Sequence, residues 1–209
     1  MDRFKFDREQ LQMVVALVAV AVVAVLFLGL TDMVTREPIA VAQKEALNRA
    51  LIQVLPEHSN DPLADAYIVE IDGTSQRFFP GKDKSGAVTS LAWETAAPDG
   101  YSGTIRILMG LLTDGSIYAI RITDHRETPG LGDGIVNNSA WLNSFVAKTI
   151  SNTRWAVKKD GGDFDQFTGA TITPRAVIKA VKSGLDMFES NKAKLLTPPA
   201  KKSTEGAKP

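Results

Sequence analysis

The residues of this chain with the clearest chemical potential lie near its C-terminus, in the run Asp165 to Thr171, which reads D-Q-F-T-G-A-T. Thr173 and Pro174 follow. Threonine is a favoured helix N-cap and proline a favoured first helical residue, so this spacing predicts a helix over 174–191 capped by Thr173. The first turn of a helix has unpaired backbone N–H groups, which favour an anion beside Thr171. The run therefore predicts either a phosphate site that contains a hydroxyl group or an ordinary capped helix.

A second candidate segment lies at 125–134 and reads H-R-E-T-P-G-L-G-D-G. Its Pro-Gly dipeptide predicts a turn, and glycines would let a flat ring lie against the backbone. The glycine spacing does not fit a dinucleotide-binding fingerprint. His125 is expected to brace the adjacent turn. A plain surface turn would have a similar sequence, so this segment alone leaves the function open.

Taken together, the two segments resemble a known family. D-x-x-T-G-A-T followed by T-P resembles the flavinylation motif of FMN-binding domains, and E-T-P-G-L-G resembles a loop of the same domains. The resemblance is strongest to the G subunit of Rnf-type electron-transport complexes, and weaker to the C subunit of the sodium-pumping NADH:quinone oxidoreductase. It also includes the stretches at 97–103 and 155–162. The main departure is Thr168, where relatives often have serine, and this change keeps the hydroxyl group.

The resemblance implies a covalently bound FMN, joined through its phosphate to Thr171 by a phosphoester bond. The Glu127–Gly132 loop is expected to pack against the isoalloxazine ring, with Leu131 as an apolar contact. Lys158 is expected either to pair with the phosphate or stabilise an anionic flavin, or to be an ordinary lysine at a strand end. Residues implied to bind the cofactor are Thr168, Gly169, Ala170, Glu127, Thr128, Pro129, Gly130, Leu131, Gly132 and Lys158.

The N-terminus contains 20 consecutive uncharged residues, Leu11 to Leu30. At about 1.5 Å per residue a helix of this length spans roughly 30 Å, enough to cross a bilayer. A cleaved signal peptide is the alternative, but its apolar core is usually shorter, about 7–15 residues. Arg3, Lys5 and Arg8 precede the span and only Arg36 follows closely, so the N-terminus is expected in the cytoplasm. With the resemblance, this places the main domain in the periplasm of a bacterium, anchored in the inner membrane.

Composition excludes several other classes of protein. The chain has no cysteine, which excludes disulfides, cysteine-ligated zinc and iron–sulfur clusters. Two isolated histidines do not predict a metal site. A net charge of zero, with basic residues scattered along the chain, gives no basic region for nucleic acid. No serine, histidine and aspartate pattern indicates hydrolysis, and no catalytic residue is assigned.

Hydrophobic patterning predicts an α+β fold with one antiparallel sheet. A helix is expected at 38–55, continuing the membrane helix, followed by strands at 66–71, 76–79, 87–93, 103–112 and 116–123. A helix at 138–148, a strand at 155–158 and the final helix complete the domain. The expected divisions are a cytoplasmic N-terminus at 1–10, a transmembrane helix at 11–30, a helical stalk at 31–56, an FMN-binding domain at 57–191 and a disordered tail at 192–209.

By resemblance, the chain relays electrons between membrane subunits of an Rnf-type complex that couples ferredoxin and NAD redox chemistry to ion translocation. A flavin transferase would install the FMN. Two alternatives stay open from the residues alone. One is a membrane-anchored flavoprotein sensor or assembly factor, and the other is an anchored scaffold protein without flavin.

Overall fold

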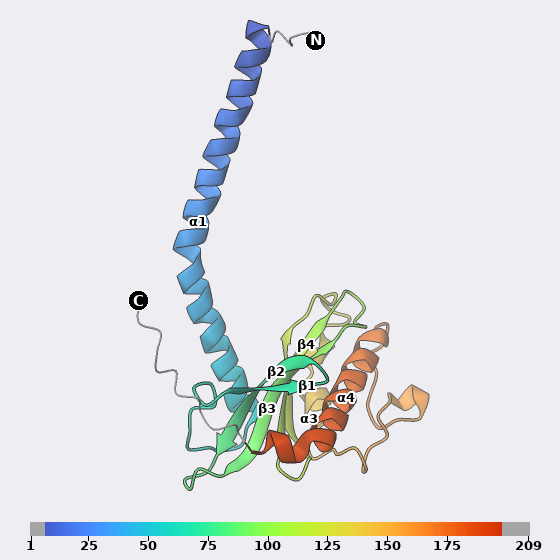
Figure 1. The fold of residues 1–209 in the computed structure, drawn as a ribbon. Coiled ribbons are helices and arrows are strands. Elements are labelled where there is room, and N and C mark those ends of the chain that lie inside the picture. The colour runs from blue at the N-terminus through green and yellow to red at the C-terminus, as the bar shows by residue number, and fades with distance from the viewer. Residues whose placement is uncertain (1–6, 198–209) are drawn as a thin grey trace. The chain divides into compact units, whose positions relative to one another are not determined.

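The computed structural model describes residues 7–197. The chain divides into two compact units between Ala46 and Leu47. The first unit is helical, and the second contains a five-stranded sheet with helices (Figure 1).

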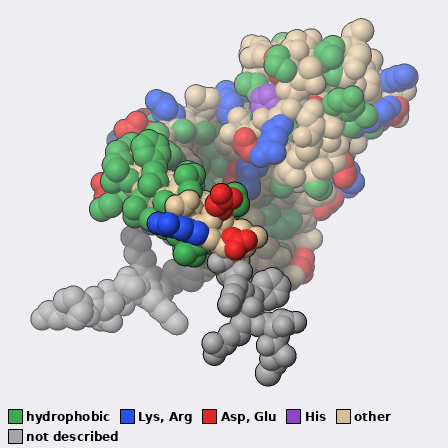
Figure 2. Space-filling model, turned by 90° about the horizontal axis from the view of Figure 1, so that it is seen from above, with side chains coloured by type: hydrophobic (Ala, Val, Ile, Leu, Met, Phe, Trp, Pro, Cys, Tyr) green, Lys and Arg blue, Asp and Glu red, His purple; other side chains and the backbone are tan. Residues whose placement is uncertain are grey.

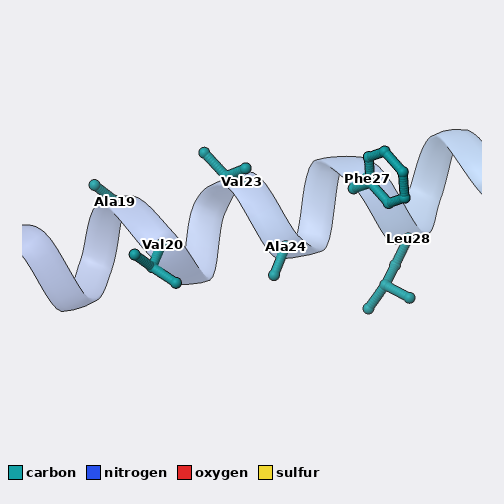
Figure 3. Close-up of a pocket in the computed structure, with 6 residues that line it drawn as sticks. All are labelled: Ala19, Val20, Val23, Ala24, Phe27 and Leu28. Atoms are coloured by element: carbon teal, nitrogen blue, oxygen red, sulfur yellow. The ribbon is translucent and has the colours of Figure 1, made fainter.

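Helix α1 (Arg8–Val54) is one continuous helix of 47 residues. Pro38, expected near the start of a separate helix, lies inside it. The apolar window of α1 has a mean hydropathy of 3.1 and none of it is buried within the chain, so its length and composition suit a membrane span. Hydrophobic side chains gather along this helix in Figure 2. Figure 3 shows six side chains that project from this helix, and they form an open surface rather than a ligand cavity; they are Ala19, Val20, Val23, Ala24, Phe27 and Leu28.

The sheet is an antiparallel meander, as the sequence predicts. Its strands are β1 (Tyr67–Ile71), β2 (Thr74–Lys82), β3 (Val88–Ala97), β4 (Ile105–Leu112) and β5 (Ile117–Asp124), and they neighbour each other in chain order. Asp72 and Gly73 connect β1 to β2, and both have positive φ angles, 49° and 76°. Such a two-residue turn matches the natural twist of a hairpin.

Helix α4 (Ile172–Leu195) covers one face of the sheet (Figure 1). Its apolar side chains, spaced three or four residues apart, pack into the main core of the domain. Phe188 stacks on Trp93 of β3 with ring centroids 5.9 Å apart. Gly184 permits this close packing, because a Cβ there would lie 2.7 Å from the sulfur of Met109.

The last turns of α1 cover the opposite face of the sheet. Leu51 and Val54 are fully buried in a second cluster with Phe79 and Leu108. The backbones also approach closely, since a Cβ on Gly110 of β4 would lie 1.7 Å from the carbonyl oxygen of Val54. The compact unit therefore begins at Leu47, ten residues before the expected boundary at 57, because this helix end supplies part of the core.

Between β5 and α4 the structure differs from expectation in two places. The predicted helix at 138–148 is replaced by two short helices, α2 (Gly134–Asn137) and α3 (Ser139–Asn143). They are separated because Asn138 has extended backbone and caps α3 by accepting a hydrogen bond from the Trp141 N–H at 3.0 Å. The predicted strand at 155–158 is wrong: the chain forms one bridge, Val157 to Phe164, and the 3₁₀ turn η1 (Lys158–Asp160).

Helix α4 is longer at both ends than the predicted 174–191. Its C-terminal end includes residues 192–195, which were expected to belong to a disordered tail. Leu195 is fully buried, and the Tyr67 hydroxyl donates a hydrogen bond to its carbonyl oxygen. This tertiary contact explains why the helix continues past the last strongly apolar stretch. The rest of the expected tail, 198–209, lies outside the described residues.

Candidate functional site

Both candidate segments line one cavity of about 380 Å³. This volume falls in the range of roughly 300–1,000 Å³ that is usual for small-molecule sites. Three parts of the chain contribute: the turn between β3 and β4, the loop after β5, and the start of α4. The lining residues are Tyr101, Glu127, Thr128, Leu131, Gly132, Gly169, Ala170, Thr171, Ile172 and Thr173.

Glu127 joins these three parts. Its side chain is 4% exposed, and both carboxylate oxygens accept hydrogen bonds. Oε1 accepts from the backbone N–H of Ser102 at 3.1 Å, and Oε2 accepts from the hydroxyl of Thr173 at 2.6 Å. Hydrogen bonds to a charged acceptor are among the stronger ones in proteins. Glu127 therefore fixes the β3–β4 turn and the first turn of α4 against its own loop.

Two glycines allow the chain to pack directly against this carboxylate. A Cβ on Gly132 would lie 2.6 Å from Glu127 Oε2, and a Cβ on Gly100 would lie 3.0 Å from Oε1. Any side chain at Gly132 would have to displace buried groups. The second glycine of the E-T-P-G-L-G loop, Gly132, is thus explained by the close approach of its backbone to the Glu127 side chain.

The loop that carries Glu127 is held by local hydrogen bonds. The N–H of Glu127 donates to Nδ1 of His125 at 3.2 Å, which requires the histidine proton to be on Nε2 in the neutral ring. This contact confirms the expected bracing role of His125. At the other end of the loop, the Thr128 carbonyl oxygen accepts from the N–H groups of Leu131 and Gly132, each at 3.1 Å.

The start of α4 differs from prediction in a way that matters for the chemistry. Thr171, not Thr173, occupies the N-cap position, and its hydroxyl makes no capping hydrogen bond. Thr173 lies inside the first turn, is 1% exposed, and its hydroxyl is bound to Glu127. Within residues 7–197, the backbone N–H groups of Ile172 and Thr173 have no acceptor. These donors and the helix dipole create a local preference for an anion.

The segment that precedes Thr171 is anchored to the core by Trp141. The indole Nε1–H donates to the carbonyl oxygen of Asp165 at 2.9 Å, and the ring centroids of Trp141 and Phe167 are 5.3 Å apart. Trp141 itself does not line the cavity. It acts on the site by holding the 165–167 backbone in place.

An ion pair fixes η1 to the beginning of α4. The Arg175 guanidinium donates to both carboxylate oxygens of Asp160, at 2.7 and 2.9 Å. This hydrogen bonding, together with the positive charge of Arg175, holds the pKa of Asp160 below its ordinary value. Lys158 on the same turn pairs with Asp165 at 2.7 Å.

Of the eleven residues predicted to bind or carry a cofactor, seven line the cavity. The other four, Thr168, Pro129, Gly130 and Lys158, do not. The sequence-based prediction did not assign Tyr101, Ile172 or Thr173 to the site. It included the stretch at 97–103 only in the family resemblance and treated Thr173 only as a helix cap. The missing information was tertiary, because the β3–β4 turn is held at the site by contacts with Glu127 and with Lys179 of α4.

Comparison with known proteins identifies the family of the chain. Residues 100–186 match the FMN-binding domain family. The G subunit of the ion-translocating oxidoreductase complex of Cereibacter sphaeroides is 42% identical, covering 85% of this chain and 84% of that protein. The corresponding G subunit of Pseudomonas aeruginosa is 39% identical, covering 85% and 88%. Among solved structures, NqrC of Shewanella oneidensis aligns with a TM-score of 0.49 and 23% identity, over 62% of this chain and 68% of that one. The chain belongs to the family of G subunits of ion-translocating oxidoreductase complexes.

Proposed function

We propose that this chain is a membrane-anchored electron-transfer subunit that carries FMN joined by a phosphoester bond to Thr171. The observation that carries the proposal is the different environment of three neighbouring threonines. Thr171 lines the cavity at the first turn of α4 with a hydroxyl that makes no capping bond. The hydroxyl of Thr173 is buried and bound to Glu127, and Thr168 is exposed outside the cavity lining.

The residues around the cavity fit FMN. Unpartnered N–H groups of Ile172 and Thr173 suit a phosphate beside Thr171. Gly169 has φ 78° and only one atom within 4 Å of an added Cβ, so the backbone there is open to a ligand. Leu131, with a half-exposed side chain, offers an apolar surface for a flat ring. The bound flavin would supply the redox chemistry, and the chain would hold and orient it.

The cavity suits a relay better than an enzyme site that acts on its own substrate. Glu127 is the only carboxylate that lines it, and both of its oxygens already accept hydrogen bonds from the chain. No histidine or lysine lines the cavity. Among the described residues, the lining therefore offers no histidine, lysine or unbonded carboxylate that could exchange a proton with a separate substrate.

The continuity of helix α1 from its apolar segment to Val54 supports a membrane anchor that is retained rather than cleaved. The charges that precede its apolar segment favour an N-terminus in the cytoplasm. We infer that the sheet domain lies on the periplasmic side of the inner membrane. In this arrangement the electron donor and acceptor are other membrane subunits of an Rnf-type complex, which links ferredoxin and NAD chemistry to ion movement. A flavin transferase would attach the FMN, and the covalent bond would prevent its loss by dissociation.

The test is intact mass and peptide mapping of the full chain expressed with a flavin transferase. We expect an FMN-sized addition on the peptide containing Thr171 in the wild-type protein and in the matched variant Thr168→Ala. Thr171→Ala should carry none while keeping the near-UV circular dichroism of the folded domain. Persistence of the adduct in Thr171→Ala would overturn the assignment. Co-purification with multi-spanning redox subunits from native membranes tests the relay role.

A further inference from the structure

Tyr101 stands out among the residues that line the cavity. It is the only aromatic residue in the lining. Its side chain is 69% exposed and makes no hydrogen bond or ring contact within residues 7–197. The other two tyrosines differ, since Tyr67 is buried against Leu195 and Tyr118 lies on β5 away from the cavity.

The turn that carries Tyr101 is fixed on both sides of it. The N–H of Ser102 donates to Glu127, and the carboxylate of Asp99 pairs with Lys179 of α4 at 2.5 Å. Gly100 packs so closely that a Cβ there would lie 2.2 Å from the carbonyl oxygen of Gly103. An exposed side chain on an ordinary surface turn needs no such tethering. These contacts hold the backbone of the turn, and with it the Cα of Tyr101, at the edge of the cavity.

The lining has two chemically different parts. Hydroxyl groups, unpaired N–H groups and the carboxylate lie at the start of α4 and at Glu127. Apart from Ile172 on the same turn of α4, the larger apolar surface comes from Tyr101 and Leu131, whose side chains are 69% and 49% exposed. A phosphate at the polar part leaves the apolar part for a flat aromatic ring. Aromatic rings favour offset-stacked or edge contacts with one another.

We propose that Tyr101 is a cofactor-contact residue whose ring lies against the isoalloxazine ring of FMN and covers part of it. The inference rests on the proposed function and extends it to a residue outside the segments 125–134 and 165–171. A phenol in contact with a flavin has a spectroscopic consequence. The light-excited flavin accepts an electron from the phenol and then returns it, so emission is quenched without net oxidation of either group.

The experiment measures flavin fluorescence yield of the full chain, normalised to covalent flavin from absorbance and intact mass. Tyr101→Phe keeps a ring of similar shape but removes the easily oxidised phenol, and Tyr101→Leu removes the ring as well. Both should emit several-fold more strongly than the wild type. Tyr118→Phe is the matched control, because that ring does not line the cavity, and its emission should equal that of the wild type.

Unfolding supplies an internal reference. In guanidinium chloride the contact is lost, so wild type and all three variants should emit equally per flavin. Equal emission of folded wild type and Tyr101→Phe, with the adduct present in both, would overturn the contact while leaving the covalent site intact. A rise in Tyr118→Phe equal to that in Tyr101→Phe would also overturn it. Absence of the adduct from the wild type would instead refute the proposed function, and the ring contact with it.

Discussion

Replacing Thr173 by valine tests the idea that Glu127 holds the site together. The substitution exchanges a hydroxyl for a methyl group and removes the hydrogen bond of 2.6 Å to Oε2. Both side chains are almost fully buried, so water cannot replace the lost donor without rearrangement. One oxygen of a buried carboxylate would then lack a partner.

The size of the effect follows from the type of bond. Hydrogen bonds to charged groups contribute about 1.5–3 kcal/mol, so Thr173→Val should lower the free energy of unfolding by this amount. For a domain of this size, each 1 kcal/mol lost from the free energy of unfolding lowers Tm by roughly 2–4 °C, so the fall in Tm should be about 3–12 °C. Thr173→Ser keeps the hydroxyl and should lose well under half as much.

The assay is thermal unfolding of the full, flavin-free chain in detergent, followed by near-UV circular dichroism of the aromatic core. Thr171→Val is the matched control, because it makes the same chemical change two residues earlier, where the hydroxyl has no capping partner. Its stability should stay within about 0.5 kcal/mol of the wild type. Equal losses in Thr173→Val and Thr171→Val would refute the reasoning about Glu127.

Two further predictions concern packing and pH. Gly132→Ala should destabilise the domain by about 1–3 kcal/mol in the same assay, because the new Cβ would lie 2.6 Å from Glu127 Oε2, and an unchanged Tm would contradict this close packing. Burial raises the pKa of Tyr67 from 10.0 to about 12, so its neutral form is favoured in the folded state. The associated stability is fully present below pH 10 and is lost as the pH rises to 12, by at most about 2.7 kcal/mol. Urea unfolding of the wild type and Tyr67→Phe should show this loss only in the wild type; parallel curves from pH 9 to 12 would contradict it.

The sheet was largely predictable because its strands are apolar runs separated by turn residues. Strict alternation of buried and exposed residues is found in β1, whereas β2, β3 and β4 each contain at least four consecutive buried residues. β4, predicted at 103–112, forms at Ile105–Leu112. β2 is longer than the predicted 76–79 and runs through Pro80. A proline usually argues against a paired strand, but β1 pairs with β2 only as far as Phe78, so Pro80 has a neighbour on the β3 side alone.

The site was predictable as two motifs but not as an assembled structure. Local rules select Thr173 as the N-cap because Pro174 follows it. The hydroxyl of Thr173 is instead bound to a carboxylate 46 residues earlier in the chain, and helix α4 begins before it. No local pattern reports such a contact. The same applies to Tyr101, whose turn is brought to the cavity by Glu127 and Lys179.

The close approach of Gly110 to Val54 has a practical consequence for preparing the sheet domain without the apolar part of helix α1. A truncated protein that starts at residue 57, where the sequence places the domain boundary, would lack the turns that bury Phe79 and Leu108. The uncovered face of the sheet would be apolar and prone to self-association. A soluble version that begins at or just before Leu47 keeps this cover and should remain monomeric.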